Sequence, residues 1–62
     1  MNHLLRVEIV KNFATQADFA HAMKLQEAFV SRVIRGRIQL KETELKRWAK
    51  ALKCDPDDIL NN

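Results

Sequence analysis

Residues 16–36, QADFAHAMKLQEAFVSRVIRG, decide the fold of this chain. Apolar residues recur at helical spacing on both sides of residues 24–26, which leaves only a short turn between two helices. Ala20 supplies a bare methyl group where two steeply crossing helices tolerate nothing larger. The residues expected to face inward are Phe19, Ala20, Met23, Val30, Val33 and Ile34. The stretch therefore predicts two short helices that pack against each other across a tight turn.

The ends of these two helices have their own signals. Thr15 fits the cap of the first helix, with Asp18 in the position of an approximate capping box. The second helix is expected over about residues 27–35. Gly36, the only glycine, follows it where a left-handed backbone is common.

The flanking sequence predicts further helices. Leu5, Ile9 and Phe13 recur every four residues, which indicates a helix over about residues 3–12. Another helix is expected over about residues 42–53, and its inward residues are Leu45, Trp48, Ala49 and Leu52.

The end of the sequence predicts a fifth helix. Asp55 fits its N-cap and Pro56 its first residue, while Ile59 and Leu60 anchor it to the core. No alternating apolar and polar run indicates a strand. We therefore predict an all-α fold of five short helices in a single domain, residues 1–62.

Composition limits the function classes. A chain of 62 residues has little room for a deep catalytic cleft, and no cluster of polar residues indicates an enzyme. His3, His21 and Cys54 do not supply the four ligands of a structural zinc site, and Cys54 reads as a buried hydrophobe. We expect no metal, cofactor or small-molecule substrate. The single cysteine and the lack of a membrane-spanning apolar run favour the cytoplasm and no membrane partner.

Charge is segregated along the chain. Residues 24–53 contain nine lysines and arginines against three glutamates, whereas the remainder contains two against five acidic residues. A local positive field of this kind attracts a polyanion, although a Lys-rich helical surface without function is the alternative.

The second helix of the pair exposes one polar face, formed by Gln26, Glu27, Ala28, Ser31, Arg32 and Arg35. Its side chains are short or hydrogen-bonding at the front and cationic at the rear. An α-helix fits the major groove of B-DNA, and side chains near its N-terminus reach base edges. This face therefore predicts double-stranded DNA as the partner.

The sequence resembles the Cro/repressor-type helix-turn-helix domain of phage and bacterial regulators, also called lambda-repressor-like. The residues that support the resemblance are 13–20, 30–36, 45–52 and 56–60, so it covers about residues 5–60. It implies a helix-turn-helix over about residues 16–35 and a sequence-specific transcriptional regulator. Since 62 residues leave no room for a second domain, a phage or prophage Cro-like repressor that acts by operator occupancy is expected.

The resemblance assigns roles by position. The residues implied to contact bases are Gln26, Glu27, Ala28 and Arg32. The residues implied to contact phosphates are Gln16, Ser31, Arg35, Arg37, Gln39 and Lys41. Arg bidentate to guanine is the commonest specific contact, which makes Arg32 the leading candidate.

Each role has a plainer alternative. Glu27 also fits a first-turn residue that compensates the helix dipole. Arg32 also fits an intramolecular ion pair, and Gln16 an exposed residue that starts a helix. The basic loop residues 37–41 also fit a solvated loop. Phe29 fits either the edge of the core or contact with a thymine methyl group.

Three positions depart from the family pattern. Lys24 stands where a glycine is usual, so a left-handed backbone there costs on the order of 1 kcal/mol. Gln26 is a weaker helix cap than the usual small polar residue. Ile34 stands where a glutamate is common, which suggests either deeper packing or contact with a partner.

A homodimer on a pseudo-palindromic operator is expected, with half-sites roughly 34 Å apart. Ile38, Leu40, Ile59 and Leu60 are the candidates for the self-contact, because they remain once the core is filled. The rival hypothesis is a protein-interaction module on the same scaffold, such as an antitoxin, with Ile34 in its contact surface.

Overall fold

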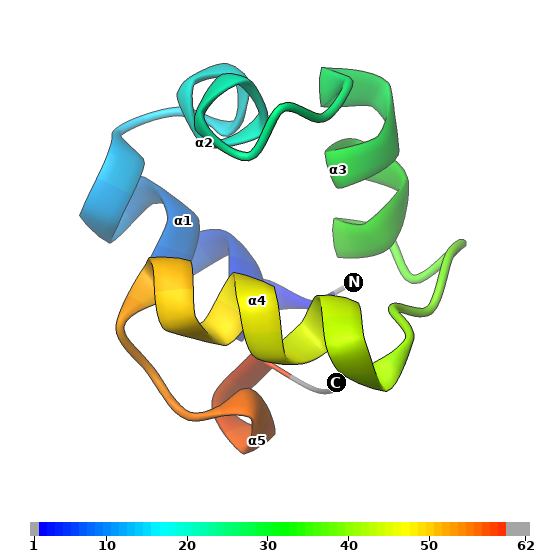
Figure 1. Ribbon diagram of the computed structural model, residues 1–62. Coiled ribbons are helices and arrows are strands. Elements are labelled where there is room, and N and C mark those ends of the chain that lie inside the picture. The colour runs from blue at the N-terminus through cyan, green and yellow to red at the C-terminus, as the bar shows by residue number, and fades with distance from the viewer. Residues whose placement is uncertain (1, 60–62) are drawn as a thin grey trace.

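The computed structural model describes residues 2–59, and within them it contains five α-helices and no strand. The helices are α1 (His3–Phe13), α2 (Gln16–Ala22), α3 (Glu27–Ile34), α4 (Glu42–Leu52) and α5 (Pro56–Ile59), as Figure 1 shows. The all-helical prediction with five helices is confirmed. Helix bounds agree to within two residues: α1 extends one residue beyond the predicted end, and α3 and α4 each stop one residue short.

The buried core contains residues from all five helices. The residues predicted to face inward in α2 and α3 are all buried, with Phe19 and Val30 completely inaccessible and Ala20 2% exposed. The core residues of the other helices are Leu5, Ile9, Trp48, Ala49, Leu52 and Ile59. Leu45, predicted to be inward, is only partly buried. Leu60, predicted to anchor α5, lies outside the described residues.

Aromatic side chains bridge the widest part of the core. No Cα atom of α2 or α3 lies within 8 Å of a Cα atom of α4. Trp48 of α4 spans this distance, with its ring centroid 5.0 Å from that of Phe19 and 6.3 Å from that of Phe29. Both pairs have the edge-to-face geometry that aromatic rings favour. Trp48 is therefore a core residue, as predicted, and Phe29 packs at the edge of the core.

Hydrogen bonds at two helix starts differ from the predicted pattern. The Thr15 Oγ1 accepts from the Asp18 N–H at 3.0 Å, but the Thr15 N–H donates to the Phe13 carbonyl, so only half of the capping box forms. Asp55 precedes α5 as predicted. The observed side-chain bond there has the opposite direction, because the Asp55 N–H donates to the Asp58 carboxylate at 3.2 Å.

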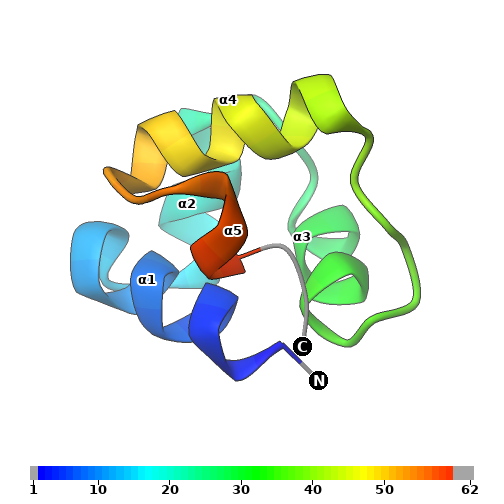
Figure 2. The ribbon, with the colours of Figure 1, turned by 90° about the horizontal axis from the view of Figure 1, so that it is seen from below.

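Two asparagines that no sequence pattern marked join distant helix ends. The Asn2 side chain accepts from the Leu5 N–H at 3.0 Å and donates to the Ile59 carbonyl at 2.9 Å. The Asn2 N–H also donates to the Ile34 carbonyl at 2.7 Å. Asn12 donates to the Leu52 carbonyl at 3.1 Å. These bonds fix the start of α1 to the ends of α3 and α5, and its last turns to the end of α4 (Figure 2).

Left-handed backbone conformations mark the ends of helices. Gly36 has φ +82°, as predicted, and has no Cβ to be strained there. Lys24 adopts φ 59° in the turn between α2 and α3, as its family position implied. A side chain in this conformation stores strain that glycine would relieve.

Replacing Lys24 with glycine is expected to stabilise the protein by about 0.5–1 kcal/mol, because the left-handed strain outweighs the added chain entropy. For a domain of this size the melting temperature should rise by roughly 2–8 °C. Thermal unfolding followed by circular dichroism measures this. Lys24→Ala, which removes the charge but keeps the Cβ, should show no gain; an equal gain in both variants would mean that charge is the cause.

Candidate functional site

The pair formed by α2 and α3 positions the candidate site. The turn of Met23 to Gln26 is closed by two hydrogen bonds, from the Lys24 N–H to the His21 carbonyl and from the Leu25 N–H to the Ala20 carbonyl at 2.8 Å. Gln26 enters α3 in an extended conformation and makes no side-chain cap bond, which agrees with its prediction as a weak cap. The tight turn fixes the direction of α3 relative to α2.

The inner side of α3 is buried in the core. Val30, Val33 and Ile34 are 0%, 7% and 2% exposed. Of the two alternatives for Ile34, deeper packing is therefore the correct one. Its predicted role in a contact surface for a protein partner is wrong, because its side chain is not accessible.

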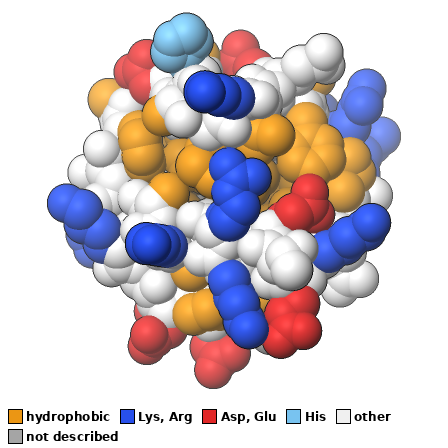
Figure 3. Space-filling view, viewed as in Figure 1, with side chains coloured by type: hydrophobic (Ala, Val, Ile, Leu, Met, Phe, Trp, Pro, Cys, Tyr) orange, Lys and Arg blue, Asp and Glu red, His pale blue; other side chains and the backbone are white. Residues whose placement is uncertain are grey.

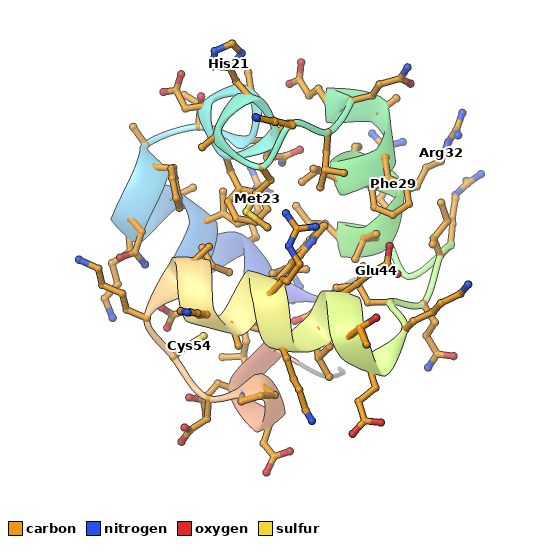
Figure 4. The ribbon with its side chains drawn as sticks, viewed as in Figure 1. His21, Met23, Phe29, Arg32, Glu44 and Cys54 are labelled. Atoms are coloured by element: carbon orange, nitrogen blue, oxygen red, sulfur yellow. The ribbon has the colours of Figure 1, made fainter. Side chains whose placement is uncertain are left out.

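The outer side of α3 presents the predicted polar face. Ala28 and Arg32 form one row at a spacing of four residues, and Glu27, Ser31 and Arg35 form the row beside it. All of these side chains are exposed except Ser31, which is half-buried. In Figure 4 Arg32 points away from the rest of the protein. The structure thus brings together the base-contact candidates that the sequence placed on this helix, and Gln26 is exposed at its start.

The cations of α3 have no acidic partner among the described residues. The two ion pairs in that part of the chain join Lys11 to Glu8 at 3.8 Å and Lys46 to Glu42 at 3.5 Å, on α1 and α4. Arg32 and Arg35 therefore remain free to bind an external anion. The intramolecular ion pair considered for Arg32 is not found within residues 2–59.

The remaining phosphate-contact candidates lie at the start of α2 and in the connection after α3. Arg37, Gln39 and Lys41 are exposed in the connection that leads from α3 to α4, while Gln16 is half-buried as the first residue of α2. The connection is held in place at both ends. The Arg37 N–H donates to the Arg32 carbonyl at 2.9 Å, and the Glu44 carboxylate accepts from the Lys41 N–H at 3.1 Å.

The family follows from the sequence profile. The profile of DUF739, described as a protein of unknown function, matches residues 3–62. The chain belongs to the DUF739 family. No curated protein and no solved structure matches it significantly.

A metal-binding cluster and a membrane-spanning helix are both absent from the described part of this DUF739 protein. Within the described residues no group of three or more His, Cys, Asp or Glu side chains is placed to hold a metal ion. None of the described helices is long and apolar enough to cross a membrane.

Cys54 was predicted to be buried but is only partly so. Desolvation raises the pKa of its thiol, and the carboxylates of Glu8, Asp58 and Asp55 raise it further. The thiol therefore stays protonated at neutral pH and is a weak nucleophile. The surface hollow beside it also contains Lys11, Lys50 and Lys53, so its charges largely balance.

The structure describes three of the four apolar residues that were predicted for self-contact. Ile59 is 3% exposed, so its prediction as a self-contact residue is wrong, and Leu60 lies outside the described residues. Ile38 and Leu40 pack partly against the core. Among the described residues, the most exposed large hydrophobic side chains are on α1, where Leu4, Val7 and Val10 are 58%, 57% and 50% exposed. The four-residue spacing of Leu5 and Ile9 identified the buried face of α1. It did not identify the exposed apolar residues on the opposite side of the helix.

Proposed function

We propose that this DUF739 protein is a sequence-specific double-stranded DNA-binding regulator of transcription, and that α2 and α3 form a helix-turn-helix. One observation supports this most strongly: the outer side of α3 is exposed and contains two arginines without intramolecular acid partners among the described residues. Short side chains lie beside them, so a helix in this position can approach the floor of a major groove closely.

The proposed base contacts follow from the chemistry of each side chain. Arg32 would donate two hydrogen bonds to the O6 and N7 of a guanine. The methyl group of Ala28 would pack against that of a thymine, and the Glu27 carboxylate would accept from a cytosine amino group. Gln26, at the start of the helix, would reach a base edge with its amide.

Contacts to phosphate would hold α3 in register. The candidates are Gln16, Ser31, Arg35, Arg37, Gln39 and Lys41. Such contacts position a protein on DNA without reading sequence. One helix of this length covers few base pairs, so two copies on a pseudo-palindrome are part of the proposal, and the mechanism would be steric exclusion of polymerase from an overlapping promoter.

The first test is binding of fluorescently labelled random-sequence duplex DNA, followed by anisotropy at several salt concentrations. For non-specific binding we expect a micromolar or weaker affinity that falls steeply as the salt concentration rises. Sedimentation of the protein alone and with a full site tests the dimer. A monomer in both conditions would remove the dimer from the proposal.

Arg37→Ala and Lys41→Ala are expected to lower the salt dependence of binding on any duplex. Each variant removes one cation that neutralises a phosphate, so the slope of log affinity against log salt should fall by about 0.9 in magnitude. The measurement is the anisotropy titration above, repeated for each variant. A slope equal to that of the unmodified protein would show that the residue is a solvated loop cation.

A further inference from the structure

A second surface lies beside the proposed DNA-binding face. Figure 3 shows a band of hydrophobic side chains that crosses one face of the protein, with Lys and Arg side chains above it, across it and below it. In Figure 4 Met23, after α2, and Phe29, on α3, face this side, opposite α4. We call these two side chains, with the Trp48 ring beneath them, the apolar band.

The apolar band results from the way the core is built. Because α4 does not approach α2 or α3 closely, large side chains must fill the space between them. Trp48 fills it from below and is 2% exposed, whereas Phe29 remains partly exposed above it. Met23 is 9% exposed, so Phe29 supplies most of the accessible surface of the band. The Phe29 ring is fixed by its edge-to-face contact with Trp48, so this surface is preformed.

Cations border the apolar band on both sides. Lys24 lies in the turn directly after Met23, and its side chain is exposed. On α4, Arg47 follows Glu44 by three residues and Lys50 follows Arg47 by three, so these side chains form one row. Both cations are exposed, and neither takes part in the two ion pairs of the described residues. The Glu44 carboxylate at the end of the row is engaged with the Lys41 N–H.

The apolar band adjoins one flank of the polar face of α3. Phe29 precedes Arg32 by three residues, so these two side chains are neighbours on the helix surface, whereas the row of Glu27, Ser31 and Arg35 lies further round. Successive helical residues are rotated by about 100°, so Phe29 lies about 200° around the helix from both Glu27 and Ser31. Phe29 and Glu27 therefore lie on opposite flanks of α3. A ligand on the apolar band leaves the row of Glu27, Ser31 and Arg35 accessible.

We propose that the apolar band binds an acidic, amphipathic segment of another protein. An apolar anchor of that segment would pack on the partly exposed Phe29 ring, and its carboxylates would pair with Lys24, Arg47 and Lys50. The charge of the border decides the class of partner, because three cations without acid partners among the described residues repel a basic segment and attract an acidic one. This inference does not depend on DNA binding.

The test uses a designed helical peptide with leucines at helical spacing and glutamates elsewhere, labelled with fluorescein. A matched peptide carries lysine for every glutamate. Anisotropy is measured at physiological salt, where charges more than about 8 Å apart are screened from each other. The acidic peptide is expected to bind at least tenfold more tightly than the basic one. Equal binding of the two peptides would overturn the proposal.

Charge-reversed variants locate the site. Lys24→Glu with Arg47→Glu should weaken binding of the acidic peptide at least tenfold. Lys46→Glu with Lys53→Glu makes the same change in net charge, on α4 and directly after its end, and should weaken it less than twofold. Equal effects of the two double variants would show that net charge alone is responsible and would contradict the proposal. Circular dichroism confirms that each variant is folded, as expected for exposed positions.

The same variants separate this proposal from the proposed DNA binding. Lys24→Glu with Arg47→Glu is expected to weaken duplex binding no more than Lys46→Glu with Lys53→Glu does. A selective loss of duplex binding would mean that the apolar band belongs to a nucleic-acid surface, and the proposal would be wrong. Peptide binding without any duplex binding would instead refute the DNA-binding function and leave this proposal intact.

Discussion

Trp48→Ala is expected to leave the protein largely unfolded at room temperature. Removing a buried Trp side chain costs about 3–5 kcal/mol, and a single core in a domain this small supplies about the same amount. The cost should lie at the high end, because Trp48 alone connects α4 to the rings of Phe19 and Phe29. The backbones of α2 and α4 are already too far apart for the cavity to close without a large shift.

Urea unfolding followed by far-ultraviolet circular dichroism measures this destabilisation. Trp48→Phe keeps an aromatic ring in the same place and should retain a cooperative transition. Lys50→Ala, an exposed change on the same helix, should alter the free energy of unfolding by no more than about 0.5 kcal/mol. If the free energy of unfolding of Trp48→Ala were within about 1 kcal/mol of that of the unmodified protein, the core would not depend on this ring, contrary to our description.

Arg32→Ala is expected to weaken binding to the best duplex site by about 1–3 kcal/mol, which is roughly five- to 150-fold. The alanine cannot donate the two hydrogen bonds to guanine, so discrimination against other bases at that position should disappear as well. Binding to random-sequence duplex should change much less. Competition anisotropy on the two kinds of duplex measures both effects.

Lys46→Ala is the control, because it removes one exposed cation from α4 and leaves α3 unchanged. It should affect both kinds of duplex slightly and equally. Equal weakening on the best site and on random duplex for Arg32→Ala would show that Arg32 contacts only phosphate. No weakening on either would remove Arg32 from the site altogether.

Most of the fold follows from periodicity and from helix-end signals. The spacing of Leu5 and Ile9, and of Val30, Val33 and Ile34, identifies the buried faces because residues at this spacing lie on one side of a helix. The left-handed turn at Gly36 is equally local, since it depends on the absence of a Cβ.

What the sequence did not predict depends on contacts between distant residues. Asn2 and Asn12 bind carbonyl groups of helices far along the chain, and nothing in their own neighbourhood indicates which. The burial of Ile59 results from the packing of α5 against α1 and α4, so counting leftover apolar residues wrongly placed Ile59 among the candidates for self-contact. The apolar band has the same origin, because its existence depends on the separation of α4 from α2 and α3.

Part of the candidate site could be predicted from the sequence, and the reason is geometric. The exposed face of α3 follows from its buried face by rotation, so the rows of Glu27 and Arg32 could be predicted. Whether an arginine is free or paired depends on the positions of all acidic side chains, and sequence alone does not give these positions. The structure supplies those positions for the described residues and shows that Arg32 has no intramolecular acid partner there.

Selection of bound sites from a pool of random duplex DNA tests the central claim, that the outer side of α3 reads a DNA sequence. After several rounds we expect enrichment of two inverted half-sites, with centres about 10 base pairs apart and a conserved guanine in each. Recovery of a pool whose base composition has not changed, or failure of the protein to retain any duplex, would contradict the claim.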